Sequence, residues 1–106
     1  MSGVYSPYPS EKDYMDLLET MLVVLRDAQE VSNKKTLAND PERGSAQKFA
    51  GNCIMVTRNI VNSLNELYYE NDIPTRASLV HFSHAGWAVE IIEIDKPTTI
   101  MYGERK

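Results

Sequence analysis

Apolar residues in the first 70 positions recur every three or four residues, which is the spacing of helices buried along one side. The first such run predicts a helix from about Glu11 to Val31, begun by Ser10 as N-cap with Asp13 in the capping-box position. Asp40-Pro41 predicts a second start, with regular helix from residues 41–45 to about Glu70. We therefore expect two amphipathic, antiparallel helices.

From Arg76 onward the pattern changes to β-branched and aromatic residues, which favour strands. Residues 76–84 and 87–95 are predicted as the strands of a hairpin, and residues 98–102 as a short third strand after a turn. The predicted fold class is α+β: two helices followed by a C-terminal antiparallel hairpin or meander of two to three strands. One domain is expected over residues 10–103, between an extended, proline-containing arm (1–9) and a charged tail (104–106).

The hairpin register stays open between two alternatives. A two-residue loop at Ala85-Gly86 pairs His84 with Trp87, but it needs a positive φ that alanine disfavours. A type I turn with Gly86 in the left-handed region pairs Ser83 with Trp87 and has the more favourable turn chemistry. In both registers neither face of the sheet is polar. In the second, one side carries Leu79, Trp87, Val89 and Ile91, and the other carries Val80, Phe82, Ile92 and Ile94.

Two helices can cover only one of these faces. Burying three large side chains of the other face is worth about 4–8 kcal/mol before the costs of association. We therefore expect a homodimer or a stable complex with another protein.

Residues that carry chemistry are few. The chain has one cysteine and two histidines, and it has no glycine-rich phosphate loop. His81 and His84 are three positions apart on a strand and point to opposite faces, so we expect two surface histidines and no metal site. Cys53 lies within the apolar face of the second helix, where a cysteine acts as a small hydrophobic residue. We expect no enzyme activity and no cofactor.

Charge and cysteine content limit the partners and the compartment. The net charge of −4 repels phosphate backbones at long range, so nucleic acid is not an expected partner, despite Lys34, Lys35 and Arg43. A lone cysteine cannot form an internal disulfide, and the start of the chain lacks the pattern of a signal peptide. The longest apolar stretch, Met21 to Leu25, is too short to cross a bilayer. The sequence thus indicates a cytoplasmic protein with no membrane partner.

Large aromatic and aliphatic side chains are the best candidates for recognition, because they offer much contact area at low entropic cost. The predicted partner-binding residues are Tyr5 and Tyr8 in the arm, Trp87 and Ile92 in the hairpin, and Asp16 and Glu19 in an acidic strip of the first helix. Lys12 and Arg26 lie at i,i+4 distances from acidic residues of that strip, which is also typical of a solvated face.

The leading interpretation is a small, non-enzymatic protein-interaction module, homodimeric, that adapts or inhibits a larger partner. Very small acidic proteins without catalytic sites are also what mobile genetic elements use to block host enzymes. The alternative is a small-ligand-binding or sensing protein with a pocket between the second helix and the sheet, near Tyr68, His81 and Trp87.

Overall fold

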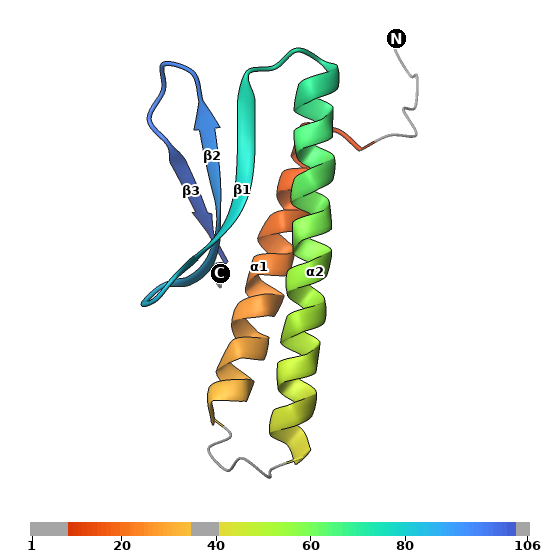
Figure 1. Ribbon diagram of the computed structural model, residues 1–106, viewed down its shortest axis with the longest axis vertical. Helices are drawn as coiled ribbons and strands as arrows, with labels where there is room; N and C mark the ends of the chain where they lie inside the picture. The colour runs from red at the N-terminus through yellow and green to blue at the C-terminus, as the bar shows by residue number, and fades with distance from the viewer. Residues whose placement is uncertain (1–8, 35–40, 104–106) are drawn as a thin grey trace.

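A computed structural model describes residues 9–34 and 41–103. It contains two helices followed by a three-stranded antiparallel sheet, which confirms the predicted fold class (Figure 1). The predicted arm, apart from Pro9, and the predicted tail lie outside the described residues. The elements are α1 (Glu11–Lys34), α2 (Pro41–Glu70), β1 (Thr75–Phe82), β2 (Gly86–Glu93) and β3 (Thr99–Tyr102).

Helix α1 begins at the predicted capping box. The backbone N–H of Ser10 donates to the Asp13 carboxylate at 2.9 Å, and the N–H of Asp13 donates to the Ser10 hydroxyl at 3.3 Å. The bond from the Ser10 backbone holds the pKa of Asp13 below its ordinary value. The helix continues to Lys34, beyond the predicted end at Val31. Polar residues other than glycine and proline are only slightly unfavourable in a helix, so α1 continues although the apolar pattern has stopped.

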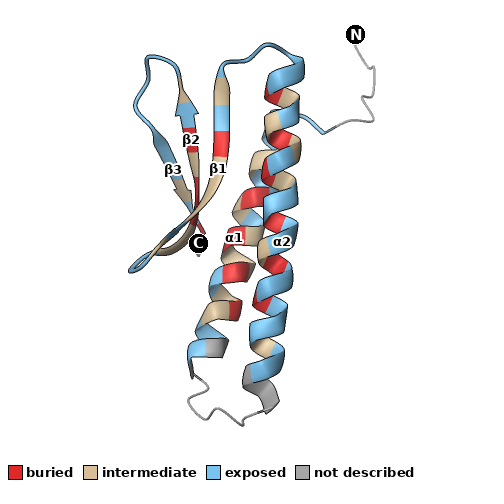
Figure 2. Cartoon of the chain, in the orientation of Figure 1, coloured by how far each residue is buried: buried red, intermediate tan, exposed pale blue. Residues whose placement is uncertain are grey.

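The two helices form an antiparallel hairpin, and the sheet lies against the N-terminal half of α1 and the C-terminal half of α2 (Figure 1). Figure 2 shows that buried residues alternate with exposed ones along both helices and that further buried residues lie in β1 and β2. The core between helices and sheet consists of Leu18, Leu22, Val61, Leu64, Tyr68, Ala77, Val89 and Ile91. A second cluster packs α1 against α2 and consists of Leu25, Ala28, Ala50 and Cys53.

The hairpin register differs from both predictions. His81 lies opposite Trp87 and Phe82 lies opposite Gly86, so residues 83–85 form a three-residue loop. Gly86 has the positive φ (80°) expected of it, but it pairs with Phe82 at the start of β2, whereas the second alternative made it a bulge. The observed register differs from the second alternative by two positions, and side chains alternate with a period of two. The assignment of side chains to faces in that alternative is therefore correct.

Two polar contacts attach the sheet to the helices. The side chain of Asn65 in α2 donates to the carbonyl of Ala77 in β1 and accepts from its N–H, both at 2.8 Å. The guanidinium of Arg26 in α1 donates to the carbonyl of Gly103, just after β3, at 3.0 Å. The two edge strands of the sheet are thus each tied to a different helix.

Candidate interaction surface

The sheet face that points away from the helices carries several large apolar side chains beside Arg76, Ser78 and Glu90, and no described element covers it. We call it the outer face and define it as Val80, Phe82, Ile92, Ile94, Ile100 and Tyr102. Ile92, Ile94, Ile100 and Tyr102 are 37 to 65% exposed, and Val80 and Phe82 are half-buried. Large apolar side chains of this kind, gathered on one face, mark interaction surfaces more often than single exposed ones do.

The aromatic side chains of the outer face are already packed together. Phe82 in β1 and Tyr102 in β3 reach across β2, with ring centroids 6.3 Å apart. The small residue Ala88 lies between their strands and is fully buried beneath its larger neighbours. Ser78 and Glu90 pair on the same face and are its polar members nearest the centre. A partner would therefore meet a preformed apolar surface at low conformational cost.

The apolar surface continues around the end of the sheet. Around the connection between α2 and β1, Tyr69, Ile73, Ile92 and Ile94 line an open hollow of about 570 Å³. We call Tyr69 and Ile73 the end patch. Ile92 belongs to the outer face and also lines this hollow, so one partner can contact the outer face and the end patch together.

Of the four predicted partner-binding residues that the structure describes, only Ile92 lies in the outer face. Trp87 points to the helix side, packs on both core clusters, and contacts His81 edge-on at 4.8 Å between centroids. Its removal would therefore weaken the fold itself. Asp16 is exposed and accepts a hydrogen bond from Lys12 at 2.9 Å. Tyr5 and Tyr8 lie outside the described residues.

The prediction omitted Ile100 and Tyr102 as site residues, although both lie in the outer face. The facing of β3 follows from its pairing with β2, where Ala88 lies opposite Tyr102 and Glu90 opposite Ile100. Strand β3 has only four residues, too few for its own pattern to decide which face it presents.

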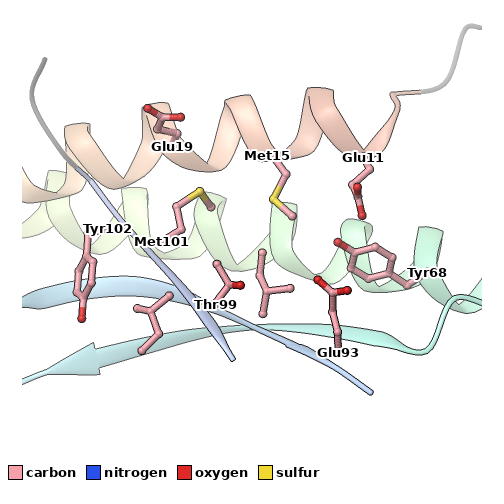
Figure 3. Close-up of a pocket in the computed structure, with 10 residues that line it drawn as sticks. Glu11, Met15, Glu19, Tyr68, Glu93, Thr99, Met101 and Tyr102 are labelled. Carbon is pink, nitrogen blue, oxygen red and sulfur yellow. The ribbon is translucent and has the colours of Figure 1, made fainter. Parts of the chain in front are cut away.

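Tyr68 and Glu19 line a different hollow, of about 590 Å³, between α1 and the strands β2 and β3 (Figure 3). The hydroxyl of Tyr68 lies near the carboxylate of Glu11, with Glu93 at the same end (Figure 3). The pKa of Tyr68 is raised mainly by burial of its side chain, and to a smaller extent by the nearby carboxylates of Glu11 and Glu93. The hydroxyl is itself fully buried and has no hydrogen-bond partner among the described residues, so a molecule in the hollow would not reach it.

The three residues of the predicted ligand pocket do not line one common hollow among the hollows described. His81 and Trp87 line a third hollow, of about 560 Å³, with Arg26 of α1. Tyr68 is not among the residues that line it. Both hollows border α1, whereas the predicted pocket was placed between the second helix and the sheet.

Metal chemistry and a reactive thiol find no support in the described part of the chain. Residues 9–34 and 41–103 contain no group of three or more His, Cys, Asp or Glu side chains that could hold a metal ion. Cys53 is buried among apolar residues, and this burial raises the pKa of its thiol, as expected of an inert structural cysteine. No helix in these residues is long and apolar enough to span a bilayer.

Comparison of the chain with protein-family models, with curated proteins and with solved structures finds no match.

Proposed function

We propose that this protein is a small, non-enzymatic cytoplasmic interaction module that adapts or inhibits a larger protein, which it binds through the outer face of its sheet. The observation that supports the proposal is a preformed layer of six apolar side chains that no described element covers. A lone, buried cysteine is in keeping with a reducing compartment.

The size of the outer face favours a transient partner. Two strands of eight residues and one of four, at about 3.3 Å per residue and about 4.8 Å per strand, cover roughly 320 Å². Stable interfaces bury about 800 Å² on each partner, and transient signalling contacts bury less. The end patch around Tyr69 and Ile73 enlarges the contact available to a partner that reaches around the end of the sheet.

Replacement of Ile100 by glutamate should weaken partner binding at least about tenfold, because the added carboxylate would have to be desolvated within the contact. The matched control is Met55→Glu, since Met55 is also exposed and apolar but lies on α2, away from the sheet. Tagged wild-type chain, Ile100→Glu and Met55→Glu would be used as baits in lysate of the source cells, followed by quantitative mass spectrometry.

The expected result is a protein captured by the wild type and by Met55→Glu but lost with Ile100→Glu. The proposed function is refuted if no captured protein distinguishes these two variants. Thermal melts of all three chains show whether a lost partner reflects unfolding instead. Because Ile100 is exposed at the edge strand, its replacement should cost no more than about 1 kcal/mol of stability, the scale of the repulsion from Glu90 directly opposite.

A further inference from the structure

The helical hairpin has a second apolar surface, on the side opposite the sheet. On α1, Leu22 and Met15 mark the sheet side, because Gly103 packs on the backbone of Leu22 and Met15 lines a hollow with β2 and β3. Successive helical residues turn by about 100°. Leu17, two positions after Met15, and Val24, two positions after Leu22, therefore point nearly the opposite way, away from the sheet. On α2, Asn65 binds β1, and Val56, nine residues or about two and a half turns earlier, also points away from the sheet.

We call this surface the back face. Its members occur at alternating steps of three and four residues, the spacing at which helices interdigitate in four-helix bundles. Four of them, Leu17, Val31, Phe49 and Val56, remain 46 to 53% exposed, although they are large and apolar. The line on α1 runs through Leu17, Met21, Val24, Ala28 and Val31, and the line on α2 through Phe49, Cys53, Val56, Ile60, Ser63 and Leu67. Ala28 and Cys53 are the inner members of these lines and are buried between the helices, whereas Met21, Ile60 and Leu67 are partly buried against the core.

The side of the helical hairpin that carries the back face is large enough for the contact of a stable dimer. Helix α1 has 24 residues, so it is about 36 Å long, and two packed helices are about 20 Å wide. The product is roughly 700 Å² per chain, close to the 800 Å² that each partner of a stable complex buries. The outer face of the sheet offers about half of this. Area therefore favours the back face for a permanent contact and leaves the outer face for a transient one.

Neither line of the back face contains a charged side chain. A partner that recognised this surface by ion pairs would find no counter-charge within it, whereas a second copy presents the same uncharged 3-4 pattern. Two antiparallel hairpins with such a pattern are self-complementary about a two-fold axis.

We propose that a second copy of this chain docks back face against back face, so that the four helices form a bundle with one sheet on each outer side. In this dimer both outer faces stay free for the larger partner. The homodimer expected from the sequence is thereby assigned to the helices, and it does not depend on what the outer face binds.

Multi-angle light scattering at micromolar concentration tests this proposal. The wild type should have twice the chain mass of 12.0 kDa, and Val56→Glu should have the mass of one chain. The matched control is Met55→Glu: Met55 is 63% exposed and adjacent in the same helix, but it points about 100° away from Val56. It should remain dimeric. If Val56→Glu does not fold by circular dichroism, Leu17→Glu on the other helix gives the same test.

A monomeric wild type, or a folded Val56→Glu or Leu17→Glu chain that stays dimeric, would overturn the proposal. It would also be overturned if Met55→Glu dissociated the dimer as completely as Val56→Glu. Loss of the dimer in Ile100→Glu, with Val56→Glu unaffected, would place the second copy on the outer face. The proposal of a back-face dimer and the proposal that the outer face binds a partner can thus be refuted independently of each other.

Discussion

Asn65→Ala is expected to lower the free energy of unfolding by about 2–4 kcal/mol. The Asn65 amide occupies the place of a missing neighbouring strand: it satisfies both the N–H and the carbonyl of Ala77, on the free edge of β1. Ala77 is almost completely buried, so water cannot easily replace the lost partner. Leaving a buried backbone group unpaired costs about 1–3 kcal/mol, and two groups are affected.

The same substitution three residues earlier provides the control. Asn62 lies on the same helix but is exposed, so Asn62→Ala should change stability by less than about 0.5 kcal/mol. Urea denaturation measures both variants. Hydrogen exchange at the Ala77 amide adds a local readout, since this amide should exchange much faster only in Asn65→Ala. If the two variants had equal stability, the amide of Asn65 would not be what holds β1 to α2.

The elements of this fold were predictable because each depends on local pattern. Helix spacing, the Ser10 cap and the strand composition all act within a few residues. The hairpin register was not predictable in the same way, because a two-residue, a three-residue and a bulged loop can all be built around Gly86. Packing of Ala77 and Leu79 on the helices beside Val89 and Ile91 excludes the two-residue loop, which would place Val80 and Phe82 on that side, and this contact is absent from the local sequence.

The candidate surfaces, too, could be predicted from the sequence only in part. Two apolar sheet faces follow from the strand composition, so the outer face could be expected. The back face could not be separated from the core by periodicity alone: Phe49 and Val56 belong to the same wide apolar side of α2 as Cys53 and Leu64, yet the first two are exposed and the last two buried. The positions of α1, which covers Cys53, and of the sheet, which lies over the cluster that contains Leu64, divide that side into two surfaces.

Gly103→Ala is expected to destabilise the docking of β3 against α1. A Cβ atom at this position would lie closer than 3.0 Å to three backbone atoms of Leu22 and Val23, where no flexible side chain can move aside. Strand and helix must therefore separate, which also breaks the hydrogen bond from Arg26 to the Gly103 carbonyl. Forcing an added group into a close-packed contact costs about 1–3 kcal/mol, and the lost bond from a charged donor adds about 1.5 kcal/mol or more.

Gly51→Ala is the control, because the same added methyl should have the opposite effect there. Gly51 lies within α2, and its added Cβ would meet no atom within 4 Å. Alanine should stabilise the helix at this position by about 0.5–1 kcal/mol, because glycine is the poorer helix former. The melting temperature should therefore fall in Gly103→Ala and rise in Gly51→Ala. Equal shifts would mean that the close approach of Gly103 to Leu22 is not needed for β3 to dock, and that the polar contact with Arg26 is sufficient.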